Sequence, residues 1–115
     1  MTQSLGQNYI GGQRSANGSV KLQSVDAATG EALPQDFYQA TPEEVDAAAK
    51  AAAQAYPAYR ALSAARRAQF LDAIADELDA LGNDFVELVC RETALPAARI
   101  KGERGRTSGQ MRLFA

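Results

Sequence analysis

Cys90, in the segment LVCRETALP, is the single cysteine of the 115-residue chain and the first candidate for nucleophilic chemistry. A reactive thiol needs a lowered pKa, which a helix N-terminus, a neighbouring cation or a general base can provide. Cys90 falls late in a predicted helix, where the helix dipole disfavours a thiolate, and the chain has no histidine to serve as a base. The pattern therefore favours Cys90 as a packing residue. The absence of histidine also excludes histidine-based catalysis and a histidine-ligated metal site.

The segment GERGRTSG, residues 102–109, has the composition of a phosphate-binding loop. A P-loop needs Lys-Ser/Thr after its final glycine, and a dinucleotide fingerprint needs a preceding strand. Here Gly109 is followed by Gln110 and Met111, and the preceding residues form no strand pattern. We instead expect a helix whose small residues let another backbone approach closely.

The arginines of the last segment are a third candidate group. A solvated helix face, a nucleic-acid surface and one inward-pointing arginine that binds a small anion are the three interpretations. Nucleic-acid binding favours a continuous basic face with interleaved aromatic residues, which Phe114 alone does not supply. The residues themselves leave a solvated face and an anion site open. The group comprises Arg99, Arg104, Arg106 and Arg112.

Charge is unevenly distributed along the chain. Residues 1–90 carry a net charge of −6, and residues 91–115 carry +4, within a total of −2. With this net negative charge, no overall electrostatic attraction to nucleic acid or to an anionic membrane is expected. Asp72, Asp76 and Asp79 recur at helical spacing without other metal ligands, so they are predicted to form a solvated face rather than a site.

The elements that must position these residues begin with a β region over residues 8–39. The runs NYIGGQ and SVKLQSVDA read as strands, and Asn17-Gly18 between them is a tight-turn dipeptide. A second turn is expected in DAATGE, where Gly30 can take positive φ.

Four helices are predicted after this region, over residues 42–56, 64–81, 84–94 and 97–115. Thr41-Pro42-Glu43-Glu44 is a capping box at the first start, and Pro57 is expected to stop or kink that helix. The second begins near Ser63 and ends at Gly82 as its C-terminal cap. Its predicted buried stripe is Leu71, Ile74, Leu78 and Leu81.

The third helix is predicted to start at Asn83 as its cap, with Phe85, Leu88 and Val89 on its apolar face and Cys90 beside that face. The fourth ends on MRLFA without Gly, Pro or a polar stop signal, so we expect the native chain to continue.

Composition points to a cytoplasmic chain with a thin core. Leu, Ile, Val and Phe make up only 22 of the 115 residues, near the level at which a chain struggles to bury enough surface. An ordered pattern with so few large apolar residues indicates a segment that packs against something else. A lone cysteine and the absence of a long apolar run give no sign of secretion or of a membrane span.

In order and spacing, the chain resembles the N-terminal part of the aldehyde dehydrogenase superfamily. The resemblance runs through YIGGQ, DAATGE, ATPEEVDAAAKAAAQAYPAYRAL, RRAQFLDAIADELDAL and ELVCRETALP. Members often have tryptophan where Tyr59 stands and glycine where Ala94 stands. The last 25 residues, RETALPAARIKGERGRTSGQMRLFA, are most similar to the branch that oxidises 2,5-dioxovalerate (2-oxoglutarate semialdehyde) to 2-oxoglutarate.

The resemblance implies an α/β parent in which this mostly helical segment belongs to the Rossmann-like NAD(P)-binding domain. It implies a homo-oligomeric enzyme that uses NAD or NADP. A cysteine thiolate would attack the aldehyde, hydride would pass to NAD(P)+, and a glutamate-activated water would release the carboxylate. Those groups lie downstream in the family, so residues 1–115 are expected to hold no catalytic, cofactor-binding or metal-binding residue and to be inactive alone.

The resemblance also implies a substrate-binding role near the end of the chain. Alignment of MRLFA places Arg106 at a position that lines the substrate tunnel, with Gln110 one turn further on. A planar guanidinium suits the carboxylate of 2,5-dioxovalerate. The alternative from another class is a free-standing helical interaction module whose apolar stripes bind a partner; the reading frame beyond Ala115 would separate the two.

Overall fold

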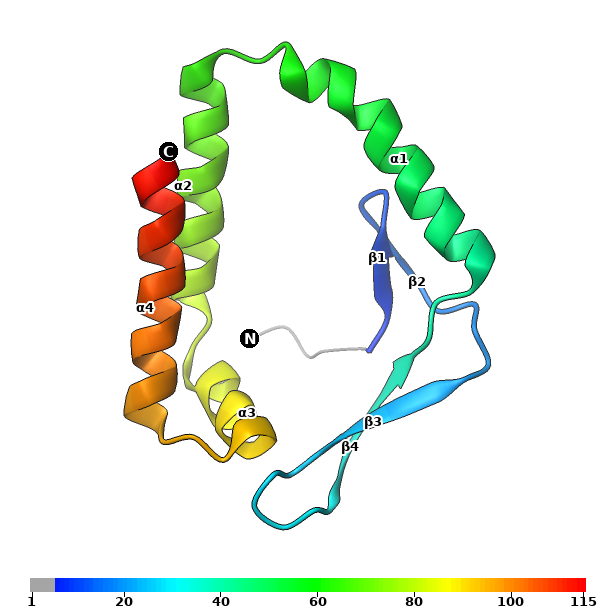
Figure 1. Cartoon of the computed structure of the whole chain (residues 1–115), viewed down its shortest axis with the longest axis vertical. Helices are drawn as coiled ribbons and strands as arrows, with labels where there is room; N and C mark the ends of the chain where they lie inside the picture. Colours follow the sequence, from blue (N-terminus) through cyan, green and yellow to red (C-terminus); the bar gives the residue numbers. More distant parts are fainter. Residues whose placement is uncertain (1–5) are drawn as a thin grey trace. The chain divides into compact units, whose positions relative to one another are not determined.

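The computed structural model describes residues 6–115, in which four short strands precede four helices (Figure 1). These residues form two compact units. The first unit contains residues 6–24 and Ala32–Ala61, with most of the β structure and one helix. The second contains Val25–Glu31 and Leu62–Ala115, with three helices. The chain is therefore mostly helical after a short β region, as the sequence predicts.

The strands of the first unit form two pairs. β1 (Asn8–Ile10) and β2 (Gln13–Ser15) are antiparallel, with Tyr9 opposite Arg14. Their tight turn is Gly11-Gly12, where φ is 58° and 78°, values that glycine adopts without strain. β3 (Lys21–Val25) pairs with β4 (Ala32–Tyr38).

The predicted tight turn at Asn17-Gly18 is wrong. The hairpin turn lies within NYIGGQ itself, and Gly18 lies in the connection between β2 and β3 with no positive φ. A Cβ at Gly18 would overlap the carbonyl oxygen of Gln39. Glycine is thus needed there for close backbone approach. The second turn is confirmed, because Gly30 has φ of 75°.

Helix α1 (Pro42–Arg60) begins at the predicted capping box. The Thr41 hydroxyl accepts from the Glu44 amide at 3.1 Å, and the Glu44 carboxylate accepts from the Thr41 amide at 3.1 Å. Such a cap contributes about 1 kcal/mol. Pro57 does not stop the helix, which continues to Arg60.

Glu44 has a second function inside the first unit. It is buried, and its carboxylate also accepts a hydrogen bond from the hydroxyl of Ser15 at the end of β2. This bond, with the backbone amide of Thr41, holds the pKa of Glu44 below its usual range. One carboxylate therefore caps α1 and joins it to the first hairpin.

Helices α2 (Ala64–Ala80) and α3 (Asn83–Thr93) follow in the second unit. The predicted start of α2 near Ser63 is confirmed, and Ser63 is its N-cap, accepting from the Arg66 amide at 3.2 Å. Gly82 does not cap the end of α2: that cap is Leu81, and Gly82 is the N-cap of α3. The prediction of Asn83 as a cap is therefore wrong by one residue, because Asn83 is already helical.

Helix α4 (Ala97–Phe114) runs alongside α2 in the opposite direction, as Figure 1 shows. Three of the most buried residues of this unit lie on α2, α3 and α4: Ala75 is 0% exposed, Val86 3% and Ile100 5%. The predicted stripe of α2, from Leu71 to Leu81, is only half-buried. The buried residue of α2 is instead the small Ala75.

Candidate functional site

Helix α4 presents two faces with different surroundings. The docking face consists of Arg104, Ser108 and Arg112, which contact α2 or its C-terminal cap, and of the buried Ile100, which lies at the same helical spacing. The outward face consists of Arg99, Glu103, Arg106 and Gln110. Each set repeats at three- to four-residue steps, so its members stack on one side of the helix.

Arg112 joins the docking face to α2. Its guanidinium lies 2.8 Å from Asp76 and 2.8 Å from Asp79, one nitrogen on each carboxylate. Arg104 adds a hydrogen bond to the carbonyl of Leu81, at the end of α2. The predicted solvated acidic face on α2 is confirmed, because the side chains of Asp76 and Asp79 are 74% and 41% exposed; these two carboxylates in addition pair with Arg112 of α4.

The electrostatics of this contact favour the charged forms. A hydrogen bond from Ser108, and then the Arg112 guanidinium, hold the pKa of Asp79 below its ordinary value. Ser108 itself is 1% exposed. Two of the four arginines are thus accounted for by the packing of α4.

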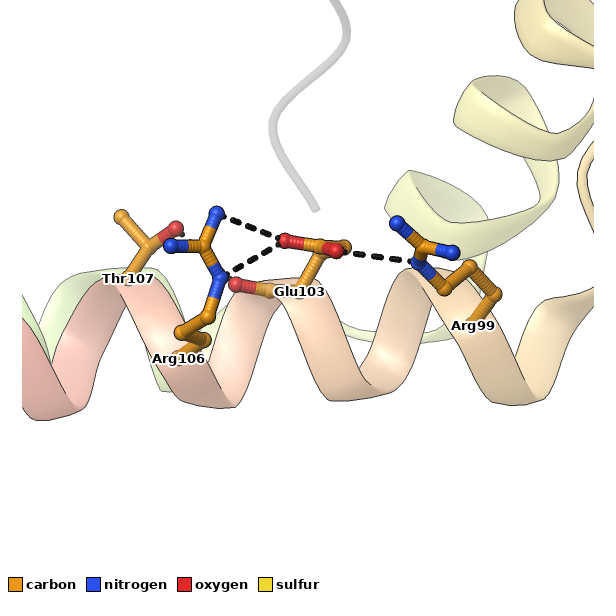
Figure 2. Close-up of polar contacts among 4 residues, drawn as sticks. All are labelled: Arg99, Glu103, Arg106 and Thr107. Carbon is orange, nitrogen blue, oxygen red and sulfur yellow. Dashed lines mark hydrogen bonds and ion pairs between the residues drawn. The ribbon is translucent and has the colours of Figure 1, made fainter.

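The outward face holds a three-residue charge cluster, shown in Figure 2. Arg99 Nε lies 2.9 Å from Glu103 Oε1. Arg106 reaches the other carboxylate oxygen, with Nε at 3.0 Å and Nη2 at 2.9 Å from Oε2. The Arg106 guanidinium, followed by that of Arg99, holds the pKa of Glu103 below its usual range.

Arg106 and Gln110 are the residues predicted to contact substrate, and the helix places them one turn apart on this face. The side chain of Arg106 is 79% exposed, and Gln110 is exposed. Two arginines against one glutamate leave the cluster with a net charge of +1. An exposed guanidinium of this kind can bind a carboxylate through paired N–H donors.

Glu103 was not singled out by the sequence reasoning. The available signal was its spacing, because oppositely charged residues three or four positions apart on a helix form ion pairs. Glu103 lies four residues after Arg99 and three before Arg106. That spacing would have predicted that both arginines share one carboxylate.

The glycines of α4 do not have the predicted neighbour. A Cβ at Gly102, Gly105 or Gly109 would meet nothing within 4 Å among the described residues. In the same segment Ser108 is 1% exposed and hydrogen-bonds Asp79 of α2. The expected close approach at the small residues of 102–109 therefore finds no neighbour at these glycines among the described residues.

Cys90 has the environment of a packing residue. It is half-buried near the end of α3, and its carbonyl accepts the amide of Ala94 at 2.8 Å. No group of three or more metal-ligating residues occurs within residues 6–115.

An apolar groove runs along α2, lined by Phe70, Ala73, Ile74, Glu77, Leu78 and Leu81. Five of these six lining residues are apolar. Among residues 6–115, no helix combines the length and the apolar character that a membrane crossing requires.

Comparison with known proteins gives consistent results. The sequence profile of the aldehyde dehydrogenase family matches residues 14–115. The chain is 42% identical, over all 115 residues, to an alpha-ketoglutaric semialdehyde dehydrogenase of Acinetobacter baylyi, and covers 22% of that protein. It is 45% identical over 111 residues to alpha-ketoglutaric semialdehyde dehydrogenase 2 of Azospirillum brasilense, of which it covers 21%.

A solved structure shares the fold. A NAD-dependent benzaldehyde dehydrogenase from Corynebacterium glutamicum superposes on 97% of the chain with a TM-score of 0.87, at 21% sequence identity, and the match covers 25% of that protein. The chain thus spans about a fifth of the length of the curated relatives it matches.

Proposed function

The chain belongs to the aldehyde dehydrogenase family, and from this premise we propose that it is the N-terminal segment of an enzyme that oxidises 2,5-dioxovalerate to 2-oxoglutarate with NAD+ or NADP+. The observation that carries the proposal is the identity of 42–45% to two relatives named for this substrate, over 96–100% of the chain. The benzaldehyde dehydrogenase that shares the fold supports a nicotinamide cofactor, since that enzyme is NAD-dependent.

The segment is proposed to belong to the cofactor-binding domain and to supply structure rather than reacting groups. The half-buried position of Cys90, late in α3, supports a different cysteine as the nucleophile. Exposed apolar side chains such as Phe70 (52%) support a surface that is covered in the complete enzyme. Residues 1–115 alone are accordingly expected to be inactive, and the complete enzyme to be a cytoplasmic homo-oligomer.

Within this segment, Arg106 is proposed to bind the distal carboxylate of 2,5-dioxovalerate. Its exposed guanidinium and the net positive charge of the outward face support this role. Gln110, one turn further along α4, can donate its amide to the same anion. Arg104 and Arg112 are unsuited to it, because Leu81, Asp76 and Asp79 already engage them.

Steady-state kinetics of the complete enzyme test the proposal. The wild type should reduce nicotinamide cofactor in step with formation of 2-oxoglutarate. Arg106→Ala should raise KM for 2,5-dioxovalerate at least about tenfold, the worth of a charge-assisted bond. KM for pentanal, an uncharged aldehyde of the same chain length, should be unchanged. Equal changes for both substrates would contradict the role of Arg106, and an absence of turnover would favour the interaction module.

A further inference from the structure

We propose that Glu103 is a specificity-determining residue: it competes with the substrate carboxylate for the Arg106 guanidinium, and Arg99 weakens this competition by sharing Glu103. The inference rests on the proposed function of Arg106. It concerns the residue that sets how much of the guanidinium is available to substrate.

The contacts of Arg106 establish the competition. Its Nε and Nη2 atoms both point to one oxygen of Glu103, at 3.0 and 2.9 Å. This edge of the guanidinium is one at which a carboxylate binds through two parallel bonds. A substrate carboxylate must displace Glu103 from that edge or bind elsewhere on a cation that Glu103 has already largely neutralised.

Arg99 opposes the competition from the other side. It occupies Oε1 of Glu103 at 2.9 Å, while Arg106 occupies Oε2. Without Arg99, the full negative charge of Glu103 would fall to Arg106, and the outward face would lose its net positive charge. Arg99 is therefore expected to favour substrate binding without touching substrate.

The ion pairs of Glu103 are exposed to solvent and therefore weak enough for a substrate carboxylate to displace Glu103. The side chains of Arg99, Glu103 and Arg106 are 61%, 37% and 79% exposed. Ion pairs at such sites contribute little to stability, because water screens them. Substitutions in the cluster should therefore leave the fold intact and act on substrate binding.

The test is a set of KM measurements on the complete enzyme. Glu103→Gln keeps the size of the side chain and removes its charge, and should lower KM for 2,5-dioxovalerate about two- to fivefold, the range of an exposed ion pair. Arg99→Ala should raise this KM by a similar factor. The double variant should resemble Glu103→Gln alone, because Arg99 acts through Glu103. KM for pentanal should not change in any of them.

Asp46→Asn is the matched control. Asp46 and Lys50 form an exposed ion pair on α1 at 2.7 Å, with side chains 63% and 71% exposed. Loss of this pair should leave both KM values unchanged. A parallel fall in KM for 2,5-dioxovalerate in this control would show a general effect of net charge and would overturn the proposal.

The outcomes also separate this proposal from the one on which it rests. If Arg106→Ala raises KM selectively but Glu103→Gln leaves KM unchanged or raises it, Glu103 does not compete, and only this proposal fails. If Arg106→Ala has no selective effect, the role of Arg106 fails and the competition fails with it.

Discussion

The docking face and the outward face of α4 each carry two arginines, but the partners of these arginines differ. Arg112 and Arg104 bind groups on α2, 23 to 36 residues away in sequence. Arg99 and Arg106 bind one glutamate of their own helix. A cation whose partners lie on another element is thus committed to the fold. A cation whose partner is local and exposed remains available for a ligand.

The largest effect should follow from Ile100→Ala on the docking face. Ile100 is 5% exposed, and truncation of a buried isoleucine to alanine costs about 2–5 kcal/mol. Hydrogen exchange of α2 and α4 amides in the complete protein would measure this cost as a free energy of local opening. Ile100→Val should cost only about 0.5–1.5 kcal/mol. Equal losses in the two variants would contradict the packing described.

Gly109→Ala should stabilise α4, whereas Ile100→Ala destabilises it. A Cβ there meets nothing within 4 Å among the described residues, and alanine stabilises a helix interior by about 0.5–1 kcal/mol relative to glycine. Hydrogen exchange of α4 should slow accordingly. A loss of protection would show that another segment approaches Gly109.

Arg112→Ala should loosen α4, whereas Arg106→Ala should not. Loss of the contacts to Asp76 and Asp79 should raise the exchange rate of α4 amides about two- to fivefold, as for partly exposed ion pairs. Arg106→Ala is the matched control on the same helix. Equal loosening by both variants would erase the distinction between the two faces.

The loss of stability caused by Asp79→Asn should depend slightly on pH. Because the folded state lowers the pKa of Asp79 below 3.8, its ionised form contributes stability that is complete above pH 3.8 and lost as pH falls through the lowered pKa. Thermal melts should therefore show a constant difference between wild type and variant above that pH, and a shrinking one below it. A difference that grows on acidification would contradict the assignment.

Local signals in the sequence predicted the helix starts well. Thr41 and Ser63 cap α1 and α2, because each cap needs only residues within one turn. The helix of residues 97–115 was predicted in spite of its glycines, and it occurs as Ala97–Phe114. The family was recognisable from the succession of short motifs, and the similarity to the alpha-ketoglutaric semialdehyde dehydrogenases from the last 25 residues.

Predictions that depend on distant neighbours were less successful. Glycine is typical of a helix C-terminus, but Gly82 is the N-cap of the next helix, α3. Asp76 and Asp79 lie on a solvated face as predicted, but their ion pairs with Arg112 were missed, because Arg112 is more than 30 residues away in sequence. The predicted turn at Asn17-Gly18 was wrong, because glycine is also needed where two backbone segments approach closely, as Gly18 approaches Gln39.

The most direct test of the division between the two faces is the ratio of kcat/KM for 2,5-dioxovalerate to that for pentanal in the complete enzyme. Arg106→Ala should lower this ratio at least about tenfold, while Arg112→Ala should leave it unchanged even if the protein becomes less stable. A ratio that falls equally in both variants, or in neither, would contradict the account.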